Sequence, residues 1–380
     1  MMKTERLRSI AVSATANLLE IASEIMRKGE EVIQLSVGEP DFPTPKRIIE
    51  AAYKAMKEGK THYTPPAGIP ELRDKVAEKM NEKYHSSLNM KNVLITPTKF
   101  GIFLSLSAIA EKGNNVLIPD PGWVSYREIV RFNLAREVRY SISEDGKINK
   151  DEIMERINKE TSAIIINSPS NPTGEILSKE DLKFFVDIAE DNGILLISDE
   201  VYSEIYYEER PPSVLEIADS FDNIVVVNGF SKSHAMTGWR VGFTISSEEN
   251  IKSMNKIQQH TITCTPSISQ YAALKALDCE KEVEEMRKIY RKRRDTGYSL
   301  LSDFMNIRKP RGTFYFFPRY ESEIKSSEVC ERLLRDKGVL VVPGSVFGER
   351  GENHLRISFS VDEEKLTEGI KRIREFFSTL

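Results

Sequence analysis

The central part of the chain alternates short apolar runs with longer segments of helical periodicity. The runs lie at residues 93–95, 116–118, 163–166, 194–197 and 224–227. A further strand pattern follows at 241–245. Runs that are apolar at every position are typical of strands that helices cover on both faces. Residues 46–280 are therefore predicted to form an α/β domain around a mostly parallel sheet.

The two ends of the chain carry a different pattern. The first part predicts one helix over 5–28, an extended piece at 32–37 and a Pro-rich turn at 38–45. A long charged helix is predicted over 280–305. It is followed by strand-like and helix-like segments at 313–317, 327–337, 355–359 and 363–377. Because 380 residues exceed what one core usually serves, we expect a large domain of residues 46–280 and a smaller α+β domain of residues 1–45 and 281–380.

Composition excludes several classes of partner. Apolar residues make up 40% of the chain and charged residues 29%, as in an ordinary globular protein. The net charge of −4 shows no basic face, so neither nucleic acid nor an anionic membrane is an expected partner. The first residues lack the apolar segment of a signal peptide. The three cysteines have neither metal-ligand nor disulfide spacing, so we expect no metal and a cytoplasmic location.

Lys232 follows the apolar run at 224–227 and lies on a loop with glycines on either side. Open α/β sheets bind ligands at the carboxyl ends of their strands. Arg240 follows eight residues later. An amine and a guanidinium at this edge suit a cofactor with an aldehyde and a phosphate, and pyridoxal phosphate has both. A solvated surface lysine is the alternative interpretation.

Other chemical groups also follow strands. Asp199 comes after the run at 194–197, where a carboxylate can keep a pyridine nitrogen protonated, although it can also cap a helix. Thr98 and Lys99 open a predicted helix, and their free N–H groups suit a phosphate, whereas Pro97 has none to donate. Trp123 follows the run at 116–118 and anchors a helix in the commoner use of an aromatic residue.

The segment 231–240, Ser-Lys-Ser-His-Ala-Met-Thr-Gly-Trp-Arg, resembles the lysine signature of class I aminotransferases of the aspartate-aminotransferase type. These are pyridoxal-phosphate enzymes of fold type I. Further matches run in the same order from about residue 36 to residue 360. The resemblance implies a large domain with a seven-stranded type of sheet, pyridoxal 5'-phosphate as cofactor, and a Schiff base through Lys232.

The resemblance also assigns roles to single residues. It makes Asp199 the partner of the pyridine nitrogen and stacks Trp123 on the ring. It places Tyr202 and Asn171 at the phenolic oxygen of the cofactor. Ser231 and Arg240 are implied to complete the phosphate site with Thr98 and Lys99.

Substrate and subunit contacts are likewise implied by resemblance. Arg356, in the strand pattern at 355–359, resembles the arginine that grips the substrate α-carboxylate as a bidentate pair, whereas on its own it would be taken as a solvent-facing strand residue. Gly38, Asn171 and Trp123 are implied to contact substrate. Tyr63 resembles the tyrosine that reaches the phosphate of a neighbouring subunit, which predicts a homodimer with shared active sites.

The sequence thus predicts amino-group transfer from an L-α-amino acid to a 2-oxo acid by a ping-pong mechanism, with Lys232 moving the α-proton. An aspartate-type donor with 2-oxoglutarate is the first choice, and aromatic or branched-chain donors are alternatives. A β-eliminating C–S lyase of the same fold shares Lys232, Asp199 and Tyr202. A transcription regulator would need a further DNA-binding domain, and a nucleotide-binding protein would leave Lys232 unexplained. Residues 12–15 and 262–265 are expected to line the distal pocket, where no dedicated basic residue is evident.

Overall fold

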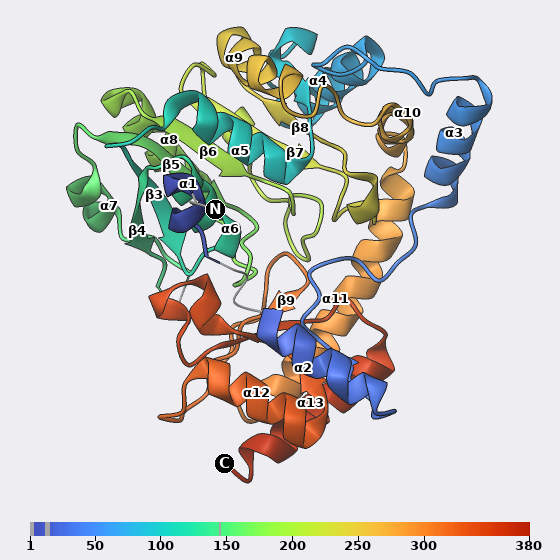
Figure 1. Cartoon of the computed structure of the whole chain (residues 1–380), viewed down its shortest axis with the longest axis vertical. Helices are drawn as coiled ribbons and strands as arrows, with labels where there is room; N and C mark the ends of the chain where they lie inside the picture. Colours follow the sequence, from blue (N-terminus) through green and yellow to red (C-terminus); the bar gives the residue numbers. More distant parts are fainter. Residues whose placement is uncertain (1–3, 12–15, 144–145) are drawn as a thin grey trace.

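The computed structural model describes residues 4–11, 16–143 and 146–380. Within these residues, a seven-stranded sheet crosses the upper part of the molecule (Figure 1). Its strands are β2 (Val93–Ile95), β3 (Asn115–Asp120), β4 (Arg136–Ser141), β5 (Thr161–Asn167), β6 (Leu195–Asp199), β7 (Ile224–Gly229) and β8 (Gly242–Ile245). Their order is β2-β8-β7-β6-β5-β3-β4, and every neighbouring pair is parallel except the two that include β8. The predicted α/β fold with a mostly parallel sheet is confirmed.

Helices cover both faces of this sheet because successive strand residues point to opposite sides. Ile164 and Ile166 join the core on one side, and Ile165 joins the core on the other. The first core lies against α3 (Lys46–Lys57), α4 (Pro70–Tyr84), α7 (Lys150–Arg156), α8 (Lys179–Asn192) and α10 (Ser267–Ala276). The second lies against α5 (Thr98–Ile109), α6 (Val124–Phe132) and α9 (Glu248–Gln259).

A second, smaller unit occupies the lower part of Figure 1 and combines both ends of the chain. One core cluster there draws on residues 18–35 and 290–376, together with residues 201–207, which follow β6. Its helices are α2 (Ala16–Arg27), α12 (Ser326–Lys337) and α13 (Glu363–Phe377), and α11 (Glu280–Ser302) runs up toward the sheet. Its strands are β1 (Ile33–Gln34), paired with β10 (Val339–Leu340), and the set β11 (Val342–Pro343), β12 (Leu355–Ser358) and β9 (Tyr315–Phe316). The domain boundaries at residues 46 and 280 stay predictions.

Short 3₁₀ helices complete the described secondary structure. They are η1 (Met90–Asn92), η2 (Val214–Glu216), η3 (Thr237–Trp239), η4 (Gly344–Phe347) and η5 (Glu349–Gly351).

The single helix predicted over 5–28 is wrong. The chain forms α1 (Glu5–Ser9) and is already extended at Ile10, well before α2 begins. The N–H of Ala11 donates to the Glu128 carboxylate of α6 over 2.8 Å. A tertiary contact with α6 therefore takes the hydrogen bond that a continuing helix would have used.

Strand β4 was not predicted because it is not an apolar run. Arg136 at its start is exposed, and its neighbours are mostly half-buried. As the edge strand of the sheet it has one pairing partner, β3. Partial burial of this kind leaves a mixed polar sequence that periodicity alone does not distinguish from a loop.

Candidate active site

A cavity of about 420 Å³ opens where the carboxyl ends of β5, β6 and β7 meet the smaller unit. Eleven of the predicted site residues line it. They are Gly38, Thr98, Lys99, Trp123, Asn171, Asp199, Tyr202, Ser231, Lys232, Arg240 and Arg356. Cavities of this size hold small molecules and cofactors. Residues from distant parts of the chain therefore converge on one site, as the order of groups after the strands predicted.

Lys232 lies just past the end of β7, inside the cavity. Its Nζ donates a hydrogen bond to the backbone oxygen of Gly38 over 2.7 Å. Burial lowers the pKa of this amine to about 8, the nearby Glu39 opposes that shift, and Arg356 adds to it. The amine therefore loses its proton closer to neutral pH than an exposed lysine does, and the surface-lysine interpretation is wrong.

Asp199 ends β6 and is almost fully buried, with 4% of its surface exposed. One carboxylate oxygen accepts a hydrogen bond from the hydroxyl of Tyr126 over 2.7 Å, and the other accepts from the N–H of Val201 over 3.2 Å. Burial raises the pKa of this carboxyl to about 6, while the Tyr126 bond lowers it. Turns rather than a helix follow β6, so the helix-cap interpretation of Asp199 is wrong.

Tyr126 lines the cavity and was missed by the sequence interpretation. It lies on α6, three residues after Trp123, and the two rings meet edge to face at 5.3 Å. Residues three apart on a helix share a face. With Trp123 at the start of a predicted helix, the spacing of three residues could have identified Tyr126 as a second residue facing the cavity. Trp123 also immediately precedes α6, so its helix-anchoring position and its place at the cavity are compatible.

Part of the cavity lining suits an anion. Thr98 is the first residue of α5, and its hydroxyl donates to the Asn228 oxygen at 3.3 Å. The first N–H groups of a helix have no partner within it and favour negative charge. A Cβ added at Gly229 would lie 2.9 Å from Thr98 Oγ1, so the missing side chain lets α5 start against the strand ends. Ser231 and Arg240 line the same cavity.

Arg356 on β12 is buried rather than solvent-facing, with 8% of its surface exposed. Its Nη1 donates to Asn171 Oδ1 over 3.2 Å and its Nη2 to the Ser36 oxygen over 2.7 Å. Its guanidinium lies over the ring of Tyr315, 4.4 Å from the centroid. Its Nε is buried with no partner among the described atoms. Because buried donors are normally paired, this arrangement suits a carboxylate ligand.

The model of the aminotransferase class I and II family matches residues 30–373. The chain belongs to this family. An aspartate aminotransferase of Pyrococcus horikoshii is 41% identical to this enzyme over 380 residues, which cover 98% of this chain and 96% of the relative. The predicted family and the predicted enzyme class, an aminotransferase, are confirmed. The family depends on pyridoxal 5'-phosphate.

Solved structures agree on the fold and differ in the named substrate. An aspartate aminotransferase of Thermotoga maritima has 36% identity and a TM-score of 0.95, covering 99% of this chain and 100% of that one. An aromatic aminotransferase of Pyrococcus horikoshii has 38% identity and a TM-score of 0.89, covering 94% of this chain and 99% of that one. The likeness in fold therefore does not choose the substrate of this aminotransferase.

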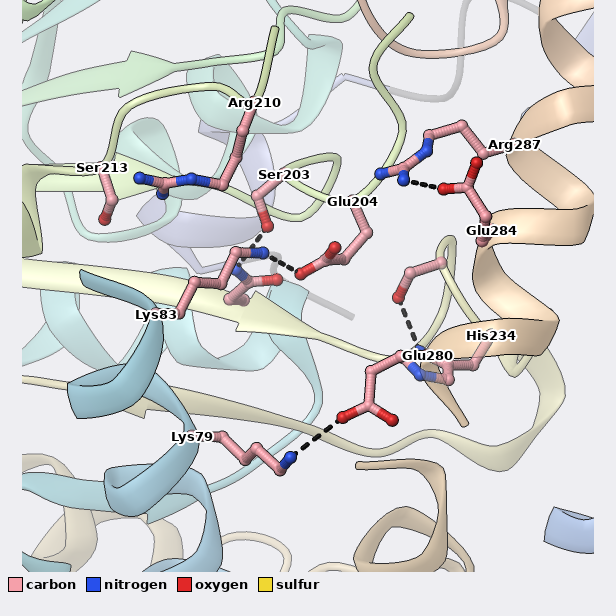
Figure 2. Close-up of polar contacts among 12 residues, drawn as sticks. Lys79, Lys83, Ser203, Glu204, Arg210, Ser213, His234, Glu280, Glu284 and Arg287 are labelled. Carbon is pink, nitrogen blue, oxygen red and sulfur yellow. Dashed lines mark hydrogen bonds and ion pairs between the residues drawn. The ribbon is translucent and has the colours of Figure 1, made fainter. Parts of the chain in front are cut away.

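Figure 2 shows a group of polar contacts that includes Ser203, Glu204 and His234. The side chains of Lys83 and Glu204 are directed at one another in this view and form an ion pair. Asn228, at the end of β7, donates to Ser203 over 3.0 Å. Burial lowers the pKa of His234 to about 4, so this ring stays neutral beside the loop. His234 belongs to the loop that carries the reactive amine, and its Nδ1 lies 2.8 Å from the hydroxyl oxygen of Ser233 in the same loop.

Some predicted features lie elsewhere. Tyr63 is 88% exposed and does not line the cavity of its own chain. Residues 262–265 are also absent from that lining, and residues 12–15 fall outside the described part of the chain. Within the described ranges, no helix has the length and apolar character needed to cross a membrane, and no cluster of three His, Cys, Asp or Glu side chains is arranged for a metal ion.

Proposed function

We propose that this aminotransferase holds pyridoxal 5'-phosphate at Lys232 and moves an amino group from an aspartate-type L-α-amino acid to a 2-oxo acid such as 2-oxoglutarate. The observation that carries the proposal is the convergence of three groups on one cavity. These are the low-pKa amine of Lys232, the buried carboxylate of Asp199 and the partly unpaired guanidinium of Arg356.

The charges in the cavity fit this cofactor. Asp199 supplies a buried negative charge where a protonated pyridine nitrogen needs a partner. The start of α5, Ser231 and Arg240 supply donors and positive charge for a phosphate. Tyr202 and Asn171 also line the cavity, and their side chains suit the phenolic oxygen. When bound, the cofactor supplies an electron sink that stabilises negative charge at the substrate α-carbon.

The protein side of the reaction is then proton transfer and orientation. Lys232 Nζ takes the α-proton of the substrate and returns it on the product side, and its lowered pKa suits both steps near neutral pH. Arg356 holds the α-carboxylate, which fixes the α-carbon relative to Lys232. Trp123 forms an apolar wall of the cavity against which a flat ring can pack.

Lys99 supports a donor with a second carboxylate. Its amine lies over the Trp123 ring, 4.8 Å from the centroid, at the cavity. Loss of solvent around the amine and the charge of Arg240 lower its pKa. In the described residues no carboxylate forms an ion pair with Lys99. The Lys99 side chain therefore supplies a basic group for the distal carboxylate of the substrate, a group that was not evident from the sequence. This role is separate from that of the Lys99 backbone N–H at the start of α5.

The substrate is tested by a screen of amino donors with 2-oxoglutarate and by Lys99→Gln. The variant should raise KM for aspartate and 2-oxoglutarate about ten-fold, the effect of about 1.4 kcal/mol, and leave alanine and phenylalanine nearly unchanged. Equal effects on all donors would contradict the role of Lys99. Preference for phenylalanine would favour the aromatic alternative. Pyruvate and ammonia formed from a β-substituted donor without oxo acid would favour the C–S lyase.

We also propose a homodimer with shared sites. The α3 helix exposes Ile49, Tyr53 and Met56, which are spaced four and three residues apart on one face, and Tyr63 lies beyond its end. Such an apolar stripe is typical of a surface that another chain covers. A second copy of this chain would bring its Tyr63 to a neighbouring site. A cytoplasmic location is proposed from the three free cysteines, which suit a reducing compartment.

A further inference from the structure

Tyr315 joins two parts of the cavity that the sequence motifs treat separately. It lies on β9 of the smaller unit, is 1% exposed and lines the cavity. Its hydroxyl oxygen lies 2.9 Å from that of Tyr202, which comes from the turn after β6. Its ring faces the guanidinium of Arg356 at 4.4 Å. One side chain therefore contacts both the tyrosine proposed for the cofactor and the arginine proposed for the substrate.

The ring of Tyr315 supports the guanidinium of Arg356. Hydrogen bonds to Ser36 and Asn171 hold two of its nitrogens, and the aromatic face supports the group from one side. A planar fork binds a carboxylate with two parallel hydrogen bonds only when its orientation is correct. A contact with an aromatic ring helps to hold that orientation without taking any N–H group.

The hydroxyl contact has a preferred direction. Each phenol carries one proton, and either oxygen can be the donor by distance alone. Burial raises the pKa of both hydroxyls, but the positive charge of Arg356 opposes this more directly at Tyr315, against whose ring it lies. The positive charge of Arg356, which lies against its ring, favours Tyr315 as the donor of the pair. If it donates to Tyr202, the proton of Tyr202 is free for an acceptor in the cavity.

The backbone of Gly38 makes room for this hydroxyl. A Cβ added at Gly38 would lie 2.8 Å from Tyr315 Oη and 3.9 Å from an Arg356 nitrogen. Contacts under 3 Å to a rigid, buried ring force a shift. The absence of a side chain at Gly38 therefore permits the position of the Tyr315 hydroxyl.

We propose that Tyr315 is a positioning residue with two separable actions: its hydroxyl donates to Tyr202, so that Tyr202 donates into the cavity to the phenolic oxygen of the cofactor, and its ring orients Arg356 for the substrate carboxylate. The inference rests on the proposed cofactor site. In this proposal the hydrogen bond from Tyr202 of the larger unit to the cofactor depends on Tyr315 of the smaller unit.

The first action is tested with Tyr315→Phe, which removes the hydroxyl and keeps the ring. A donor to the phenolic oxygen favours its deprotonated form, and a hydrogen bond received by that donor strengthens it. The pH midpoint of the visible absorbance of the bound cofactor should therefore rise, by about 0.3–0.5 unit in this variant. Tyr202→Phe should raise it by about one unit. The double variant should match Tyr202→Phe alone.

The second action is tested with Tyr315→Leu, which removes the ring as well. KM for the amino acid and for the oxo acid should rise about five-fold in Tyr315→Leu, as expected for one lost cation–π contact, and should change little in Tyr315→Phe. Tyr320→Phe is the matched control. It removes another buried hydroxyl of the smaller unit, which bonds to the Ile324 oxygen at 2.8 Å and does not line the cavity. It should alter neither the midpoint nor KM.

An unchanged or lowered midpoint in Tyr315→Phe would overturn the hydroxyl assignment, and a lowered one would show that Tyr202 is the donor. Additive shifts in the double variant would also overturn it. Equal KM values in Tyr315→Phe and Tyr315→Leu would overturn the role of the ring. Failure of the proposed cofactor site has a different signature, since the wild-type protein would then bind no cofactor and show no visible absorbance.

Discussion

Replacing Tyr126 with phenylalanine should weaken the grip on the cofactor at mildly acidic pH. The hydroxyl of Tyr126 donates to Asp199 over 2.7 Å, and both side chains are buried. Burial has already raised the pKa of Asp199 to about 6, and the Tyr126 bond is the largest of the contributions that lower it. Without that bond the carboxyl holds its proton to a higher pH. A protonated Asp199 cannot pair with a pyridinium.

The size of the effect follows from the energy of one hydrogen bond. Hydrogen bonds to charged groups contribute about 1.5–3 kcal/mol. Since one pKa unit corresponds to about 1.4 kcal/mol, the pKa of Asp199 should rise by about one to two units. Cofactor affinity falls as pH drops through the pKa of Asp199, so in Tyr126→Phe the fall should begin that much nearer to neutrality.

Cofactor affinity is measured by fluorescence titration over about two pH units on either side of neutrality. Phenylalanine preserves the edge-to-face contact with Trp123, so packing changes little. Tyr140→Phe is the matched control, because Tyr140 is buried, donates to the Ile165 oxygen at 2.8 Å and does not line the cavity. An affinity profile for Tyr126→Phe that coincides with the wild-type profile would refute the reasoning.

Three further predictions follow from other sites. Borohydride should fix the cofactor to the peptide that contains Lys232, and attachment at Lys99 would contradict the assignment. Glu200→Gln should raise Tm at pH 8 but change it little at pH 4. Burial raises the pKa of Glu200 to about 7, so the stability of the wild-type protein falls by roughly 3 kcal/mol as pH rises from about 4.5 to 7. Equal effects of the substitution at both pH values would argue against this. Mixing the inactive variants Lys232→Ala and Tyr63→Ala under conditions of subunit exchange should restore about a quarter of wild-type activity if sites are shared, because a dimer with one chain of each variant then has one complete site. No recovery would place Tyr63 outside its neighbour's site.

Residues that directly follow apolar runs could be predicted from the sequence. Asp199 and Lys232 come at the ends of β6 and β7, and parallel strands bring their carboxyl ends to one edge. These two side chains lie near each other because of the strand order, and the hydrophobic periodicity of the sequence predicts the strands. The family resemblance added Arg356 and Gly38, whose distance from the sheet in sequence hides their place at the cavity.

The sequence could not show contacts that depend on how two units pack together. Tyr315 follows no long apolar run and lies in a two-residue strand, yet its hydroxyl meets Tyr202 across the cavity. Nor could it show that the amine of Lys99 turns toward Trp123, since that depends on the angle at which α5 leaves β2. These side chains act on groups that the motifs do identify. Specificity and pKa in this cavity are therefore set largely by neighbours whose positions follow from packing, and variants of Tyr126, Tyr315 and Lys99 separate those effects from the chemistry of Lys232.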